Sequence, residues 1–191
     1  MGITILKREI LSHEKGVLEK VTFRRQRFDG KVQEVTREVY DSGDAATILP
    51  YDPERGRVLL VRQFRLPVYL ATGRETTIEA CAGKLDGMDA AKRILEEAQE
   101  EMGFTIKEPK FLFTAFMSPG SYKEKISFFV ARYNAADRTG AGGGLFDEGE
   151  DTEAIELTLD EALAMIEKGE IIDAKTIVLL QYAKLSGLLQ G

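Results

Sequence analysis

Apolar and charged residues mix along three N-terminal runs, residues 3–12, 17–28 and 31–41, over lengths typical of β-strands. The pair Asp29 and Gly30, between the second run and the third, is a strong signal for a two-residue hairpin. These runs predict an antiparallel sheet. Because so small and so charged a sheet is only marginally stable alone, we expect it to pack on another surface, and a second copy of the chain is one candidate.

The pattern becomes continuously apolar from residue 45, where a second part of the chain begins. Residues 45–52 and 57–65 are apolar runs separated by a short turn, which predicts a buried hairpin in a central sheet. We therefore expect two parts. Residues 1–44 form an N-terminal antiparallel sheet involved in dimerisation, and residues 45–191 form the larger domain.

The remaining periodicity alternates between strand-like and helix-like segments. Thr158 and Glu161 form a capping box at the start of one helix, and Gly103 and Gly169 are suited to end two helices. The mixture predicts an α+β fold, with a mixed central sheet between helices. The expected strands are residues 76–83, 110–117, 124–133 and 153–158, and the expected helices are residues 89–102, 158–169 and 174–186.

Composition narrows the function classes. The 191 residues carry 26 Lys and Arg against 32 Asp and Glu, a net charge of −6, so the basic surface of a general nucleic-acid binder is missing. No apolar run is long enough to span a membrane. With a single Cys81 and a single His13, neither an internal disulfide nor a His-rich zinc site can form, so a bound metal would take oxygen ligands. We expect a soluble cytoplasmic protein.

The most informative chemistry lies on the expected helix 89–102. Glu97 and Glu101 are four residues apart, and so are Glu96 and Glu100. Each like-charge pair of this spacing costs about 0.2–0.5 kcal/mol on an exposed helix. A bound Mg²⁺, or Mn²⁺, would convert that repulsion into shared ligation by hard oxygen donors.

A simpler interpretation stands beside this one. Glutamate is a good helix former, acidic surface helices are common, and Arg93 can pair with Glu96 or Glu97. On spacing alone, a solvated helix is the more economical hypothesis. The glycine-bounded loop that starts at Gly83 favours the metal site, because such a loop brings backbone groups to the acidic face, where a phosphate and its metal could bind.

The segment from Gly83 to Phe104 resembles the sequence box of the Nudix hydrolases. Eight residues align with defined positions of the box, and all but Asp89 and Glu96 match them: Gly83, Asp89, Glu96, Glu97, Glu100, Glu101, Gly103 and Phe104. The segment differs from the box at three points. Asp89 replaces the first Glu, one spacer residue is missing, and Glu96 stands at the position of an Arg that orients the glutamates in the family. Arg93, one turn earlier, is the candidate substitute.

The flanking segments resemble the nucleotide-sugar branch of Nudix pyrophosphatases, most closely the GDP-mannose type, with the ADP-ribose type next. They are residues 37–49, 61–65, 78–86, 117–124, 142–157 and 169–180. The resemblance implies an α/β/α sandwich and a homodimer. It also implies Mg²⁺-dependent hydrolysis of the pyrophosphate bond of a nucleoside diphosphate sugar, which yields a nucleoside monophosphate and a sugar 1-phosphate.

The resemblance also implies roles for particular residues. The metal ligands would be the carbonyl of Ala82 and the carboxylates of Glu97, Glu101 and Glu150. Glu150 would be the catalytic acid of the loop 134–152, with Glu148 as the alternative and Glu100 as a further catalytic or ligating group. The substrate-binding positions would be Arg37, Glu38, Arg65, Gly83, Glu124 and Lys175, with Arg37 and Glu38 reaching across the dimer. Without the resemblance, such charged residues are more simply solvated.

Two other functions remain open at this point. Glu96 and Asp89 depart from the box, which is compatible with a Nudix domain that binds a nucleotide sugar as a sensor without cleaving it. An ADP-ribose pyrophosphatase is the other alternative. The GDP-mannose type has an aromatic residue near position 15–17, and here residues 14–17 contain none.

Overall fold

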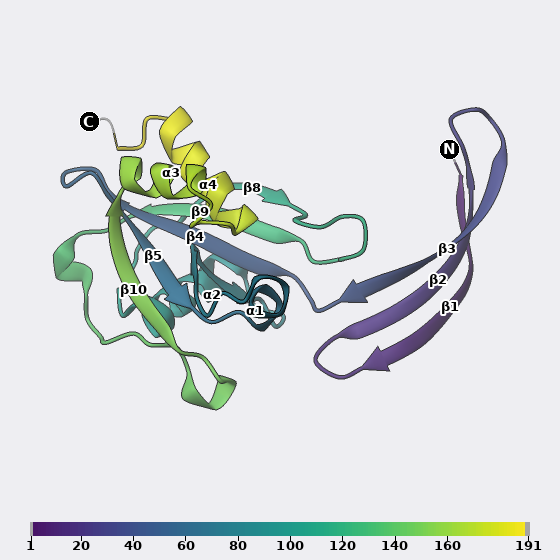
Figure 1. Cartoon of the computed structure of the whole chain (residues 1–191), viewed down its shortest axis with the longest axis horizontal. Coiled ribbons are helices and arrows are strands. Elements are labelled where there is room, and N and C mark those ends of the chain that lie inside the picture. Colours follow the sequence, from purple (N-terminus) through teal and green to yellow (C-terminus); the bar gives the residue numbers. More distant parts are fainter. Residues whose placement is uncertain (1, 190–191) are drawn as a thin grey trace. The chain divides into compact units, whose positions relative to one another are not determined.

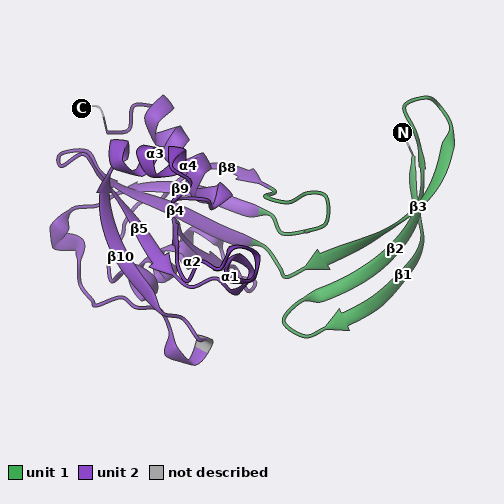
Figure 2. Cartoon of the chain, in the orientation of Figure 1, with its two compact units in different colours: residues 1–44, 116–125 green, residues 45–115, 126–191 purple. Residues whose placement is uncertain are grey.

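The computed structural model describes residues 2–189, apart from the side chain of Glu148. The chain forms two compact units (Figure 2), which are described separately below. The first unit contains residues 1–44 and 116–125, and the second contains residues 45–115 and 126–191. The first unit thus includes a second segment, residues 116–125, that lies beyond the boundary expected at residue 44.

Three strands form the sheet of the first unit: β1 (Ile3–His13), β2 (Val17–Gln26) and β3 (Val32–Asp41). They pair antiparallel in the order β1–β2–β3, as predicted. The turn between β2 and β3 places Gly30 at φ 79°, a conformation that glycine adopts without strain, and the Arg27 N–H donates to the Lys31 carbonyl across it.

Residues 116–125 pair with the end of β3. The Tyr40 N–H donates to the Ser121 carbonyl, and the Lys123 N–H donates to the Tyr40 carbonyl, both at 2.9 Å. The rings of Tyr40 and Tyr122 stack with centroids 5.4 Å apart. Gly16 makes room for this pair, because a Cβ there would lie 2.7 Å from the Tyr40 hydroxyl oxygen.

The second unit is built on a seven-stranded mixed sheet (Figure 1), which confirms the predicted fold class. The main path runs β10–β5–β4–β9–β8; β4 and β9 are parallel, whereas the other pairs are antiparallel. The strands of this path are β4 (Ala45–Asp52), β5 (Arg57–Gln63), β8 (Lys110–Ala115), β9 (Ile126–Arg132) and β10 (Thr152–Thr158).

One expected strand, residues 76–83, is divided in two. Its first part, β6 (Thr77–Glu79), pairs with β5, and its second part, β7 (Cys81–Lys84), pairs with β4. The chain changes partner at Ala80, whose N–H donates to the Thr176 hydroxyl at 2.7 Å. The Thr176 hydroxyl thus satisfies a buried backbone N–H where the chain passes from one strand partner to the other.

Helices cover both faces of this sheet (Figure 1), with α2 on one side and α3 and α4 on the other. The helices are α1 (Leu66–Thr72), α2 (Ala90–Glu97), the π-helix η1 (Ala98–Met102), α3 (Leu159–Glu167) and α4 (Ala174–Leu185). Two short 3₁₀ turns are η2 (Ala135–Asp137) and η3 (Phe146–Glu148). Helix α1 was not expected, and the helix expected over 89–102 changes to π-helical geometry at Ala98.

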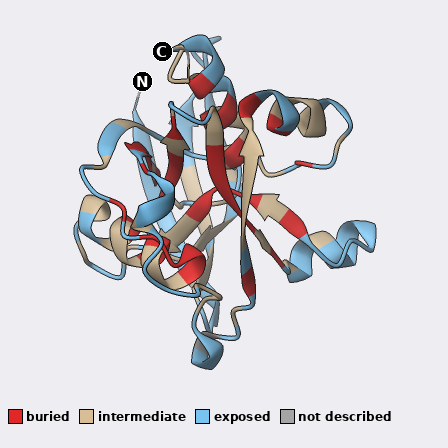
Figure 3. Cartoon of the chain, turned by 90° about the vertical axis from the view of Figure 1, so that its left-hand side faces the viewer, coloured by how far each residue is buried: buried red, intermediate tan, exposed pale blue. Residues whose placement is uncertain are grey.

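Buried residues are concentrated in the central strands (Figure 3), and successive side chains of a strand point to opposite faces of the sheet. Ile48, Leu59 and Phe129 pack with α2 and η1, whereas their chain neighbours point to the other face, where Phe128 contacts Phe113 and Phe113 contacts Tyr182 of α4. Successive residues of these strands are buried on opposite faces of the sheet, which explains the continuous apolar runs of the sequence.

Capping residues mark the helix boundaries, and those of α3 and of the π-helix are the predicted ones. The Asp89 side chain accepts the Lys92 N–H at the start of α2, and Thr158 and Glu161 form the capping box of α3. Gly103 ends the π-helix at φ 74°, and Gly169 follows α3 at φ 68°. Within residues 2–189, no helix is long and apolar enough to cross a membrane.

Candidate active site

Four acidic residues form the centre of the candidate site in the second unit: Glu97, Glu100, Glu101 and Glu150. Glu97 is the last residue of α2, and Glu100 and Glu101 lie in η1. Glu97 is 4% exposed and Glu101 is 2% exposed, because Ala98 and Met102 of the same segment are anchored in the core. The solvated-helix interpretation is therefore wrong for these two carboxylates.

Arg93 holds the acidic residues of this helix. Its guanidinium lies 2.5 Å from the Glu97 carboxylate, 3.2 Å from Glu100 and 3.6 Å from Glu96, and its Nε donates to the Lys84 carbonyl at 3.3 Å. The Arg93 side chain is only 15% exposed. Arg93 therefore makes the contacts that an orienting Arg in the box would be expected to make.

Glu101 keeps one carboxylate oxygen without a partner in the part of the chain that the structure describes. Its Oε2 is buried and has no hydrogen-bond partner among the described residues. Burial raises the pKa of Glu101 to about 7, and the nearby Glu150 adds to that effect. Hydrogen bonds from the Cys81 thiol and the Ala82 N–H, together with the charge of Arg65, act in the opposite direction. An unpaired buried oxygen of this kind is the donor that a cation would satisfy.

Glu97 lies directly against Gly83. Burial raises the pKa of Glu97 to about 8; the charge of Arg93 acts in the opposite direction, and the charges of Glu101, Glu100 and Glu150 add to the rise. A Cβ at position 83 would lie 1.6 Å from the Glu97 Oε1. Gly83 is therefore required so that a buried carboxylate can approach the backbone of β7.

The glycine-rich loop packs closely against the π-helix. The N–H groups of Gly143 and Gly144 donate to the carbonyls of Glu101 and Glu100, and the Thr152 hydroxyl also donates to the Glu101 carbonyl. A Cβ on Gly142 would lie 2.7 Å from that carbonyl. These glycines therefore hold the base of the loop against η1.

The loop brings Glu150 near the other carboxylates. Glu150 acts electrostatically on both Glu97 and Glu101, and its Oε2 accepts the Leu145 N–H at 2.9 Å. The alternative candidate, Glu148, belongs by its backbone to η3, and its side chain lies outside the described residues. The structure thus places Glu150 near Glu97 and Glu101.

The donor chemistry of this cluster fits a hard divalent cation, although the side chains are not gathered around one point. Among the described side chains, no three His, Cys, Asp or Glu residues lie close enough together to hold a metal ion. Glu97 contacts Arg93 and Glu150 contacts a backbone N–H, while Glu101 keeps an unpaired oxygen. Binding a metal would exchange those protein contacts for ligation.

Arg65 and Lys175 meet at a further buried acid, Glu79. Arg65 Nε donates to Glu79 at 3.1 Å, and Lys175 Nζ donates to it at 2.7 Å. The sequence interpretation missed Glu79, although an acid between Ile78 and Ala80 in an apolar strand is an unusual feature.

The other expected substrate residues belong to the first unit. Arg37 and Glu38 are exposed on β3, where Arg37 donates to the Thr36 carbonyl at 2.8 Å. Glu124 lies in the segment 116–125 and acts electrostatically on Tyr122. The structure thus divides the expected substrate residues into two groups, one in each unit.

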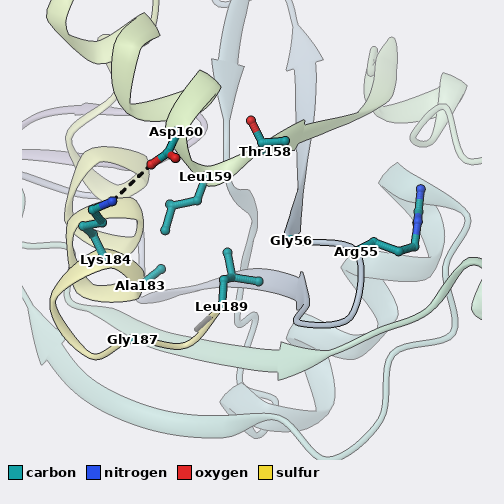
Figure 4. A pocket seen from close by; sticks show the side chains of 9 residues that line it. All are labelled: Arg55, Gly56, Thr158, Leu159, Asp160, Ala183, Lys184, Gly187 and Leu189. Carbon is teal, nitrogen blue, oxygen red and sulfur yellow. Dashed lines mark hydrogen bonds and ion pairs between the residues drawn. The ribbon is translucent and has the colours of Figure 1, made fainter. Parts of the chain in front are cut away.

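A cavity of about 260 Å³ lies at the opposite end of β5 and β10 from the acidic cluster (Figure 4). Thr158 and Gly56 line it, whereas Thr152, at the other end of β10, contacts Glu101. Lys184 and Asp160 form an ion pair of 3.1 Å in its wall. The cavity therefore contains none of the expected site residues.

Comparison with known proteins gives one consistent match. The family model described as "GDP-mannose pyrophosphatase NudK N-terminal domain" matches residues 2–40. Proteins named GDP-mannose pyrophosphatase from Klebsiella pneumoniae and Enterobacter sp. are similar to the chain, at 43% and 44% identity. The alignments cover 100% and 99% of this chain and 96% and 98% of those proteins. The protein of that name from Pectobacterium atrosepticum is 44% identical over 97% of this chain and 95% of its own.

A solved structure has the same fold. The crystal structure of an ADP compounds hydrolase superposes with a TM-score of 0.73, at 20% sequence identity, over 98% of this chain and 97% of its own. At that identity the likeness establishes the fold alone.

The approach of Gly83 to Glu97 leads to a prediction. Gly83→Ala should displace the Glu97 carboxylate and lower pyrophosphatase turnover by about 100-fold, because a shift of about 1 Å in a catalytic group has effects of that size. Steady-state kinetics at saturating divalent metal measure it. Gly120→Ala is the matched control, since a Cβ there meets nothing within 4 Å. Equal activity of the two variants would contradict the role of Gly83.

The raised pKa values give a second prediction. The folded-state pKa values of about 8 for Glu97 and about 7 for Glu101 lie above the pKa of a glutamate in the unfolded chain. At pH values between the unfolded and the folded pKa, the native state therefore binds more protons than the unfolded state. Without metal, stability should therefore fall as the pH rises from about 6 to about 8.5. Thermal unfolding in a chelator should show a declining Tm, and a Glu97→Gln, Glu101→Gln double variant should lose most of this decline. A wild-type Tm that rises over this range more than that of the double variant would refute the assignment.

Proposed function

The chain belongs to the GDP-mannose pyrophosphatase family of Nudix hydrolases, and we propose that its acidic cluster is the centre at which it cleaves pyrophosphate bonds. The enzyme hydrolyses a nucleoside diphosphate sugar to a nucleoside monophosphate and a sugar 1-phosphate. The observation that carries the assignment of the site is the buried Glu101 carboxylate with an unpaired oxygen, surrounded by further carboxylates.

Family membership implies dependence on a divalent metal ion, and we propose Mg²⁺, with Mn²⁺ as the alternative. Glu97, Glu101 and the Ala82 carbonyl would hold it, with Glu150 or Glu100 completing the oxygen donors. Such an ion neutralises diphosphate charge and lowers the pKa of a bound water. The buried carboxylates have raised pKa values without it, and this supports the proposal, because a cation would offset their repulsion.

The chain's own residues would perform the remaining steps. Glu150 would accept the proton of the attacking water, since it lies on the loop fixed against η1 and acts electrostatically on Glu101. The water oxygen would bond to one phosphorus while the bridging P–O bond breaks. The charges of Arg65 and Lys175 would bind the diphosphate.

The departures from the family box do not favour a non-hydrolysing sensor. Asp89 caps α2 through the Lys92 N–H, and Glu96 lies within 3.9 Å of the Lys92 Nζ, with its side chain 39% exposed. Neither substitution removes a carboxylate from the cluster. Arg93 makes the contacts expected of the missing Arg.

We further propose that the first unit mediates a homodimer. Its three strands expose several large apolar side chains: Ile3, Ile5, Leu6, Ile10, Leu11 and Val32. An isolated three-stranded sheet gains little stability from such exposed residues, and a second copy would bury them. In such a dimer Arg37 and Glu38 would reach the substrate of the partner.

The function is tested by assaying nucleotide sugars side by side with Mg²⁺. GDP-mannose should release GMP and mannose 1-phosphate, and ADP-ribose serves as the competing substrate. Glu101→Gln should lower kcat by about 100-fold or more, because a metal ligand is lost, whereas Glu96→Gln on the same helix should remain near wild type. If no nucleotide sugar released a monophosphate, or if Glu101→Gln kept its turnover, the proposal would fail.

The dimer is tested by light scattering coupled to size exclusion. The wild type should elute as a dimer, and an Ile5→Glu, Ile10→Glu double variant should become monomeric and lose activity, since charges would enter the buried interface. Leu185→Glu, at an exposed leucine of the second unit, is the control and should remain dimeric. A monomeric wild type would contradict this part of the proposal.

A further inference from the structure

Glu79 forms the centre of a buried ion network next to the acidic cluster. Glu79 is 3% exposed, and its carboxylate accepts hydrogen bonds from Arg65, Lys175 and the Thr77 hydroxyl. These partners come from three places in the fold: the N-cap of α1, the strand β6 and the first turn of α4.

The network stays ionised in spite of its burial. Burial alone would raise the pKa of Glu79, but the charges and hydrogen bonds of Lys175 and Arg65 outweigh it and lower the pKa to about 2. Lys175 Nζ has a second carboxylate partner, Asp173, at 2.8 Å. A buried carboxylate with two cationic partners is costly to assemble and leaves strong, directed charge at fixed positions.

Glu79 constrains the orientation of the Arg65 side chain. The carboxylate takes up the edge formed by Nε and Nη2, at 3.1 Å each, and because the guanidinium is planar this contact fixes its plane. Among the described residues Nη1 has no hydrogen-bond partner, and the Arg65 side chain is 40% exposed. Arg65 is therefore held by one edge and open at the other.

The network is joined to the cluster through the backbone. Glu79 is followed by Ala80, where the chain changes strand partner, and then by Cys81 and Ala82, which donate hydrogen bonds to Glu101. Asp173 holds Thr176, whose hydroxyl accepts the Ala80 N–H. Arg65 and Glu101 also interact electrostatically. The cations are thus placed beside the carboxylates by the same short segment.

We propose that Glu79 is a positioning residue, which orients Arg65 and Lys175 toward the diphosphate without touching the substrate. The proposal rests on the function assigned above, in which these two cations bind the diphosphate. Glu79 acts on the reaction only through them, so its effect should disappear once they are removed.

The test compares Glu79→Gln with Glu156→Gln. Glu156 also accepts two hydrogen bonds from an arginine, Arg55 at 2.8 and 2.9 Å, but at the opposite end of β10 from the cluster. Both variants lose a carboxylate that pairs with an arginine of the same unit. Glu79→Gln should lower kcat/KM for GDP-mannose by about tenfold or more, and Glu156→Gln should stay within about twofold of wild type, both measured below their Tm values.

A mutant cycle separates positioning from a general structural role. In an Arg65→Ala, Lys175→Ala background, adding Glu79→Gln should leave kcat/KM unchanged, whereas a structural role would lower it again. If Glu79→Gln does not fold, Thr77→Val replaces it, because this change removes only the hydroxyl that holds Glu79 and should still lower kcat/KM.

Failure of the proposed function and failure of the positioning role of Glu79 would give different results. A wild type inactive on all nucleotide sugars would overturn the proposed function. An active wild type, with Glu79→Gln (or Thr77→Val) no more impaired than Glu156→Gln, would overturn the positioning role alone. Additive losses in the mutant cycle would do the same.

Discussion

Glu97 and Glu101 are carboxyl groups of like charge, buried within one stretch of helix, and the structure around them depends on how that charge is balanced. Burial raises the pKa values of both groups into the physiological range, and the charge of Glu150 adds to the rise of each. Arg93 balances part of the charge on the side of Glu97, and Glu101 keeps an unpaired oxygen. A divalent cation is the ligand that would complete this balance, which explains why such costly groups are buried together.

The surrounding backbone follows from the same constraint. Gly83 lets Glu97 approach β7, and the glycines after residue 139 let the acidic loop pack on the carbonyls of the π-helix. Next to this cluster, the chain places the opposite arrangement, a buried carboxylate with two cations around Glu79. The segment from β6 to β7 therefore connects the acidic cluster, which would bind the metal ion, with the cations around Glu79, which would bind the diphosphate.

The local pattern of apolar and polar residues predicts most of the fold, because the central strands are buried on both faces and the helices carry recognisable caps. Helix α1 was missed, since Leu66 and Leu70 are exposed and leave no buried periodicity. The division of residues 76–83 at Ala80 depends on pairing with two different strands, which no local pattern records. The glutamates of the box were found from their spacing and resemblance. Glu79 was not, because its partner Lys175 lies 96 residues away in the sequence.

A divalent metal bound at this cluster would replace protons on the buried carboxylates. Calorimetric titration of the metal-free protein with Mg²⁺, in buffers of different ionisation enthalpy, measures the protons released on binding. At about pH 7 binding should release about one proton, and at about pH 9 nearly none, since Glu97 and Glu101 are already ionised there. Binding without proton release at the lower pH, or equal release at both, would contradict the account.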